Sequence, residues 1–382
     1  MMKTIKYVIL AIVSLIIIVF FVSYIVWLSY PKTYLNVYIL DKTVPDFSYE
    51  KHRSLFWVLN NSKIAKRNGK NYKVGSDYYG FHPLKPLSDC QYEIKRISIE
   101  QIDSVASSYD VAYYTDTRGV YFNEWFRGFR QHGENSVIEG GLNQNDYLLL
   151  KTMRTKDKLI IGEYNILGTP TSDLISYKTE ELFSIRSTGW TGCYYESLDS
   201  NNNEIPPSII AKYKSNNNGS WPFKKEGIIL SNNNNVIVLE NKVHLIKPLP
   251  TIVTKSELLE NYNLPDYVEF YNTFEIVTPA DSAAVIANFQ INVTAEGDSV
   301  LNMYGLKSIF PAIIVNNPQK IRTCYFAGDF TSNKVWYMFA RMANSRQILK
   351  SITHKGSKKK FFQYYYFPFI ENMLKTYSKE IQ

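Results

Sequence analysis

The chain has 382 residues, a formal net charge of +8, and aromatic residues at 15% of its length. This much apolar and aromatic material excludes a largely disordered chain, and the length left after residue 32 suits two ordinary domains. Much of the basic excess lies in the C-terminal third, including Lys355 and Lys358 to Lys360. We interpret that run as a solvated basic turn, with contact to anionic lipid or an acidic polymer as the alternative. No nucleic-acid-binding motif is present, so nucleic acid is not an expected partner.

An uncharged run from Tyr7 to Leu28 is the first feature of the chain. At about 1.5 Å per residue it spans roughly 30 Å, the thickness of a bilayer core. Aromatic residues cluster near its far end and Pro31 follows, so we predict a transmembrane anchor over Tyr7–Tyr30, in contact with the lipid bilayer. A cleaved signal peptide is the alternative, but the following WLSYPK lacks the small residues of a cleavage site.

Lysines set the expected orientation of this anchor. Lys3 and Lys6 precede the run, and positive flanks tend to stay in the cytoplasm. The sequence therefore predicts a single-pass protein of the cytoplasmic (inner) membrane, with its N-terminus inside and its C-terminal body outside the cytoplasm.

Strand and helix patterns alternate from residue 33 to about residue 200. The expected strands are Thr33–Pro45, Tyr109–Thr115 and Leu159–Tyr164. The expected helices are Tyr49–Leu59 after a Ser48 cap, Glu100–Val105, Gln144–Arg154 after an Asn143 cap, and Asp173–Phe183 after Thr171 or Ser172. Near-continuous apolar strands are typical of parallel sheets buried on both faces. This alternation predicts an α/β fold with a parallel sheet.

The pattern changes after residue 200. Gly227–Leu230 and Val236–Glu240 are expected to form a hairpin, and residues 251–330 contain β-type runs with few helix signals. An aromatic segment and a closing helix are expected from Lys360. With a soft boundary at Lys247–Pro250, the predicted units are 1–32 (tail and anchor), 33–250 (α/β domain) and 251–382 (β-rich region with a C-terminal helix).

Several chemistries have no motif here. The chain has no phosphate-binding glycine loop, no GxSxG and no HExxH, and its five His are isolated. Cys90, Cys193 and Cys324 lack metal-ligand spacing; one disulfide is possible, and three small buried residues are the default. No metal, cofactor or catalytic residue is expected.

Polar residues at the ends of the expected strands are the candidate ligand-binding residues. Asp116 and Arg118 follow one strand, Glu163 and Asn165 end another, and Glu139 precedes a double glycine. Ligands of open α/β sheets bind at the carboxyl ends of the strands, so these residues could share one crevice.

Each candidate also has a structural explanation. Glu163 could act as a general acid or base, or bond to the backbone N–H groups of the next turn. Asp116 and Arg118 could form a local ion pair. Trp190 between two glycines could stack a sugar ring or fill the core, and Asp329 could face a ligand or shape a turn.

This order of elements resembles class I glutamine-amidotransferase-like domains over about residues 36 to 245. In that family a double-glycine loop and a helix precede a strand that ends in a Cys nucleophile. Here that strand gives Gly162-Glu163-Tyr164-Asn165 without Cys, and the family's His–Glu pair is not recognisable. The pieces YYTDTRGVY, EGGLNQND, GEYNILGTPTS and TGWTGCYYESLD are similar to membrane-anchored bacterial proteins of the same layout. The resemblance implies a flavodoxin-like fold that has lost its nucleophile.

Three functions are compatible with these observations. The first is a membrane-anchored, extracytoplasmic binding or assembly protein without catalysis, with an envelope polysaccharide or envelope proteins as partners. The second is an atypical hydrolase that acts on glycans or amides through carboxylates such as Glu163 with Asp116 or Glu139. The third is a structural subunit of an envelope complex.

Overall fold

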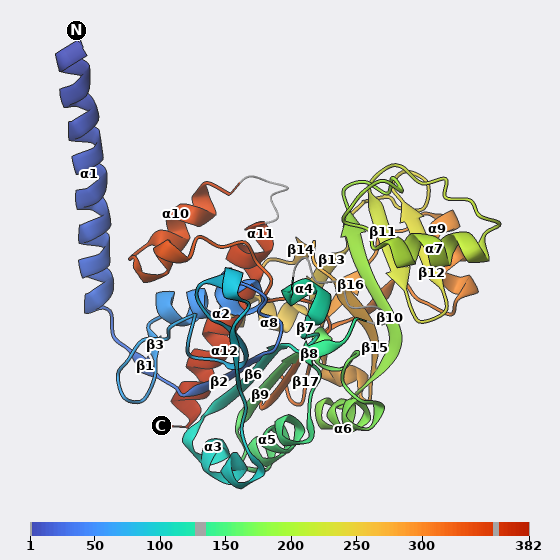
Figure 1. Ribbon diagram of the computed structural model, residues 1–382, viewed down its shortest axis with the longest axis horizontal. Helices are drawn as coiled ribbons and strands as arrows, with labels where there is room; N and C mark the ends of the chain where they lie inside the picture. The colour runs from blue at the N-terminus through green and yellow to red at the C-terminus, as the bar shows by residue number, and fades with distance from the viewer. Residues whose placement is uncertain (1, 127–134, 354–358, 382) are drawn as a thin grey trace.

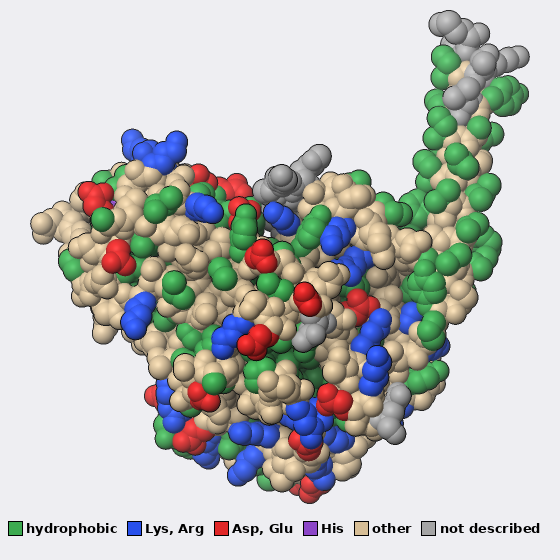
Figure 2. Space-filling model, turned by 180° about the vertical axis from the view of Figure 1, so that it is seen from behind, with side chains coloured by type: hydrophobic (Ala, Val, Ile, Leu, Met, Phe, Trp, Pro, Cys, Tyr) green, Lys and Arg blue, Asp and Glu red, His purple; other side chains and the backbone are tan. Residues whose placement is uncertain are grey.

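The computed structural model describes residues 2–126, 135–353 and 359–381. The first helix, α1 (Met2–Ser29), projects from the body for most of its length, and its surface is largely hydrophobic (Figure 2). Within the described residues, its segment Ile5–Ser29 is the one helix long and apolar enough to cross a membrane. A single N-terminal apolar helix of this kind is compatible with a single-pass membrane anchor.

The body is built on one large mixed sheet of ten strands, in the order β14-β13-β16-β17-β18-β9-β6-β2-β4-β5. Its strands are β2 (Val37–Asp41), β4 (Tyr79–Pro83), β5 (Tyr92–Lys95), β6 (Val111–Asp116), β9 (Leu159–Glu163), β13 (Thr251–Thr254), β14 (Tyr267–Glu269), β16 (Val285–Gln290), β17 (Ile309–Val315) and β18 (Thr323–Phe326). The central strands β4, β2, β6, β9 and β18 run parallel. The outer strands pair antiparallel on both sides.

Helices cover both faces of this sheet (Figure 1). The helices of the body include α2 (Glu50–Asn61), α3 (Ile102–Ser108), α4 (Phe122–Trp125), α5 (Gln144–Thr155), α6 (Asp173–Phe183), α8 (Ser256–Tyr262), α9 (Ala295–Met303), α10 (Ser345–Ser351), α11 (Lys359–Phe361) and α12 (Phe367–Glu380). Of these, α9 lies away from this sheet, beside the strand Val236–Glu240 of a second one (Figure 1). Neighbouring β6 residues identify the two faces: the Tyr114 hydroxyl donates to Asp146 O of α5, whereas the Tyr113 hydroxyl meets Tyr366, just before α12. Both tyrosines are fully buried, so both faces of the strand belong to the core.

A second, antiparallel sheet has the order β12-β11-β10-β15. It is formed by β10 (Ile185–Tyr195), β11 (Gly227–Ser231), β12 (Val236–Glu240) and β15 (Phe274–Pro279), with α7 (Pro207–Asn216) beside β12. Two short strand pairs complete the fold: β1 (Thr33–Tyr34) with β3 (Ile64–Ala65), and β7 (Val120–Tyr121) with β8 (Val137–Glu139).

Most of the elements expected before residue 200 are present. Strands β6 and β9 lie side by side and every residue in them is buried, as their apolar runs predicted. Asn143 caps α5, where its side chain accepts hydrogen bonds from the backbone N–H groups of Asn145 and Asp146. The Ser48 cap was wrong: Tyr49, in a left-handed conformation, occupies the N-cap of α2.

The expected fold class is correct at the level of a mixed α/β body behind an N-terminal apolar helix. The sheet is mixed and not purely parallel, and an amidotransferase-like domain is not confirmed. The reason lies in region 251–382, whose strands β13, β14, β16, β17 and β18 extend the same sheet that carries β9. That region also contains α8 and α9, which the sequence did not predict. Of the predicted basic turn, Lys355 and Lys358 lie outside the described residues, whereas Lys359 and Lys360 begin helix α11, so the turn was wrong there.

Candidate functional site

Acidic residues mark the carboxyl ends of the parallel strands. Strand β2 ends at Asp41, β6 at Asp116 and β9 at Glu163, and Asp329 follows β18. All four acids are buried. Because the strands run in parallel, their carboxyl ends meet at one edge of the sheet, where ligands of α/β proteins bind. The structure therefore brings Asp116 and Glu163 to a common edge, together with Asp41, which sequence reasoning missed.

Lys51, on α2, lies between two of these carboxylates. Its Nζ atom is 2.6 Å from Asp329 Oδ2 and 3.5 Å from Asp116 Oδ2. Burial lowers the pKa of Lys51, but Asp329 and Asp116 outweigh it and hold that pKa well above its ordinary value. Its side chain is 24% exposed, whereas Asp116 is 1% exposed. Lys51 is therefore the most solvent-exposed member of the cluster that it forms with Asp116 and Asp329.

Asp116 is held on every side by the surrounding chain. Its Oδ1 accepts hydrogen bonds from the Thr43 hydroxyl at 2.6 Å and from Arg118 N at 2.8 Å. Its Oδ2 accepts from the Asn165 side chain at 2.6 Å. Burial raises the pKa of Asp116, and Lys51 acts against that rise. Two candidates, Asp116 and Asn165, are thus in direct contact. Arg118 contributes its backbone N–H, and the ion pair seen for Asp116 is with Lys51.

Glu163 is enclosed by the protein. Its Oε1 accepts from the Tyr113 hydroxyl, and its Oε2 accepts from Phe330 N, Thr331 N and the Thr331 hydroxyl, at 2.8 to 3.2 Å. Its exposed fraction is 0%. Burial and the nearby Asp329 raise the pKa of Glu163 well above its ordinary value. Glu163 therefore ties β9 to the turn after β18 and offers no oxygen atom to a substrate.

A second buried pair, Asp41 and His52, has the composition of a catalytic dyad. Asp41 Oδ2 lies 2.6 Å from His52 Nδ1, and His52 Nε2 lies 3.0 Å from the carbonyl oxygen of Val74. Neither residue has any exposed surface. Both nitrogens of the imidazole ring are occupied by the protein, so the pair connects α2 to β2 and does not face a ligand.

Glu139 belongs to a separate polar network. It contacts Arg96 and lies 3.2 Å from the Nζ atom of Lys42, which also bonds Asp146 Oδ2 at 2.7 Å. Lys42 donates to the carbonyl oxygen of Gly141 as well, at 2.8 Å. This network fastens the double-glycine loop to β2 and α5, and a buried charge needs such partners. The structure therefore assigns Glu139 to the support of that loop.

Trp190 and Cys193 lie in β10, an element that the sequence did not predict. Trp190 is 6% exposed and meets the Tyr304 ring edge-on at 5.7 Å between centroids, so it fills the core. Cys193 is half-buried, and burial raises the pKa of its thiol. All three cysteines are free. Within the described residues, no group of three or more His, Cys, Asp or Glu side chains could hold a metal ion.

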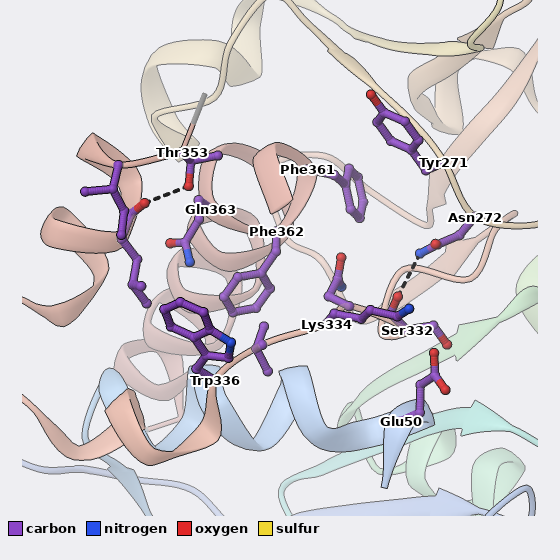
Figure 3. Close-up of a pocket in the computed structure, with 14 residues that line it drawn as sticks. Glu50, Tyr271, Asn272, Ser332, Lys334, Trp336, Thr353, Phe361, Phe362 and Gln363 are labelled. Atoms are coloured by element: carbon purple, nitrogen blue, oxygen red, sulfur yellow. Dashed lines mark hydrogen bonds between the residues drawn. The ribbon is translucent and has the colours of Figure 1, made fainter. Parts of the chain in front are cut away.

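A pocket of about 710 Å³ adjoins the Lys51–Asp329 pair. It is lined by Glu50, Tyr271, Asn272, Ser332, Asn333, Lys334, Val335, Trp336, Leu349, Ile352, Thr353, Phe361, Phe362 and Gln363. Figure 3 shows the rings of Trp336 and Phe362 together at one end, and Glu50, Ser332 and Asn272 at the other. The Asn272 side chain donates to the carbonyl oxygens of Asp329 and Ser332, so the acid cluster directly supports the polar end.

Two polar atoms of this lining are without a partner in the described structure. Ser332 Oγ and Gln363 Oε1 are both buried and make no hydrogen bond there. Buried polar atoms are nearly always paired, because an unpaired one costs about 1–3 kcal/mol. In the described structure these two atoms are exceptions, and both belong to residues that line the pocket.

Sequence reasoning singled out none of the residues that line the polar end of this pocket, although it did name the neighbouring Asp329. Ser332 lies three residues after Asp329, in the loop that follows the same strand, and this position at a strand end could have marked it as a candidate. Glu50 and Gln363 sit in helices and carry no motif. Comparison with known protein families, characterised proteins and solved structures found no match.

Proposed function

We propose that the protein is a membrane-anchored, non-catalytic binding protein whose ligand occupies the pocket beside Lys51 and Asp329. The observation that carries this proposal is a pocket of ligand size, about 710 Å³, whose lining combines aromatic rings with neutral polar side chains. The proposal of no catalysis rests on the enclosure of Glu163 and of the Asp41–His52 pair, whose polar atoms are already engaged.

The lining favours a hydroxyl-rich ligand such as an envelope polysaccharide. Its aromatic rings (Tyr271, Trp336, Phe361, Phe362) offer flat apolar faces, and Asn272, Ser332 and Gln363 offer neutral amide and hydroxyl groups. Sugars present both an apolar ring face and many hydroxyl groups. This combination supports the polysaccharide partner over a small anion, which would call for more cations.

The test uses the full chain in lipid nanodiscs and a panel of purified oligosaccharides from bacterial envelopes. We expect one class to bind, and Ser332→Ala and Gln363→Met to weaken binding about tenfold each, since one hydrogen bond contributes about 1 kcal/mol or slightly more. Gln319→Met is the matched control, because Gln319 is exposed and does not line this pocket, and it should leave binding unchanged. Absence of binding across the panel, or equal binding by all variants, would refute the proposal.

The location of the body is part of the same proposal. The lysines before α1 favour a cytoplasmic N-terminus and an external body. An alkaline phosphatase fused after Gln382 should therefore be active, since this enzyme works only when exported. A fusion that is inactive, paired with a cytoplasmic reporter that works at the same position, would reverse the orientation.

A further inference from the structure

One face of α1 packs against the body instead of leaving it. Phe20 stacks on Phe339 with 5.8 Å between ring centroids, and the Ser23 hydroxyl donates to Ala343 O at 3.0 Å. Ala343 N donates back to the carbonyl oxygen of Ser23 at 3.1 Å. Phe20 and Ser23, with Trp27, follow the i, i+3, i+7 spacing of a single helix face.

These contacts lie inside the apolar run of α1. Phe20 precedes Leu28, the end of that run, by about 12 Å along the helix at ~1.5 Å per residue. Ser23 precedes it by about 7.5 Å. A bilayer core is roughly 30 Å thick, so the body segment at residues 339–343 sits well within the length of helix expected in lipid.

The other face of the same turns is exposed and apolar. Ile25, Val26 and Leu28 are 48%, 39% and 50% exposed. If the bilayer ended near Ser23, these side chains would stand in water. If it ends near Leu28, they are covered by lipid, and Lys63, which lies over the Trp27 ring at 4.0 Å, marks the aqueous boundary.

The second placement also accounts for an apolar surface on the body. We name residues 336–352 the collar segment; Figure 1 shows its helix α10 on the side of the body nearest α1. Four large apolar side chains of this segment are exposed: Trp336 at 53%, Met338 at 69%, Ile348 at 58% and Ile352 at 57%. The segment contains Arg341, Arg346 and Lys350 and no acidic residue, a composition typical of segments that lie in a membrane interface.

We propose that the collar segment is a second membrane contact, immersed in the leaflet beside α1. Its occupant is the lipid itself. The proposal rests on the proposed membrane anchorage of α1 and goes beyond it, because a simple anchor would hold the body clear of the bilayer. Trp336 and Ile352 also line the ligand pocket, so this placement brings the pocket to the membrane surface.

The experiment measures quenching of tryptophan fluorescence by phosphatidylcholine that carries bromine on its acyl chains. The full chain is reconstituted in vesicles of this lipid, and each variant removes one of its six tryptophans. Trp336→Phe should lose the share of quenching contributed by that residue. Trp221→Phe is the matched control: it removes a tryptophan of the second sheet region, beside Tyr213 and Phe223, and should not reduce quenching.

The outcomes separate the two proposals. Unchanged quenching in Trp336→Phe, with reduced quenching in Trp27→Phe, would show that α1 spans the bilayer while the collar segment stays in water. Absence of quenching in every variant, together with release of the protein by alkaline carbonate, would overturn the anchorage as well. Circular dichroism checks that Trp336→Phe folds. The hydrogen bond from the Trp57 side chain goes to the backbone oxygen of residue 336, which this change keeps.

Discussion

Replacement of Lys51 by Met should destabilise the body strongly. The change removes the ammonium group that lies 2.6 Å from Asp329 and 3.5 Å from Asp116, and leaves two buried carboxylates without it. Loss of one partner of a buried ion pair costs about 3–5 kcal/mol. Because the Lys51 side chain is 24% exposed and water reaches it, we expect the lower end, about 3 kcal/mol at neutral pH.

The pH dependence gives this prediction a sign. Burial already raises the pKa of Asp116, and removal of Lys51 raises it further. A carboxyl group with a raised pKa binds its proton more tightly in the folded chain. Its contribution to stability is complete below the pKa of the unfolded chain and is lost as pH rises through the folded value. The penalty of Lys51→Met should therefore shrink as the pH falls toward about 4.

The assay is urea unfolding of the full chain in detergent, followed by tryptophan fluorescence at several pH values. Lys320→Met is the matched control, since Lys320 pairs with Asp157 at 3.1 Å on the open surface, where a pair contributes at most about 1 kcal/mol. Lys51→Met combined with Asp329→Asn should recover part of the loss. A penalty below about 1 kcal/mol at pH 7, or one that grows on acidification, would refute the reasoning.

Three further predictions test the other assignments. Glu163→Gln should cost under about 1 kcal/mol of folding stability and leave pocket binding intact. Glu163→Leu should cost several times more, because the backbone N–H groups of residues 330 and 331 lose their acceptor. Calorimetric unfolding compares the two variants. Gly119→Ala should lower the free energy of unfolding by more than about 2 kcal/mol, because residue 119 has φ +90° and a Cβ would collide with the carbonyl oxygen of Glu139. The control is Gly219→Ala, at φ +75° with open space around it, which should cost less in the same measurement. Because burial raises the pKa of the Cys193 thiol, it should react with iodoacetamide at pH 7 more slowly than glutathione does. Cys193→Ala should cost about 1 kcal/mol of folding stability and preserve pocket binding. Rapid selective labelling of Cys193, with loss of binding in the Ala variant, would contradict its assignment as a packing residue.

The sequence determined the features that depend on near neighbours. The N-terminal apolar helix, the buried strands β6 and β9, and the Asn143 cap all follow from the residues within each segment. Strand β10 was missed because its sequence, with Gly189 and Gly192 and a burial pattern that does not alternate, carries no regular strand signal. Helices α8 and α9 are short, seven and nine residues, and gave too little periodicity to detect.

Only the tertiary structure decided which polar residues work together. Lys51 and Asp329 are 278 residues apart, and no local pattern links a lysine in α2 to an aspartate after β18. The same holds for Glu163. The sequence suggested the backbone N–H groups of the next turn as its hydrogen-bond donors, but the donors in the structure belong to residues 330 and 331. The pocket is assembled from α2, the 271–272 loop, the 332–336 segment and the start of the C-terminal helices. Side-chain periodicity indicates which face of a helix or strand is buried. Which residues that face contacts depends on the order of the strands in the sheet, and packing across the whole chain sets that order.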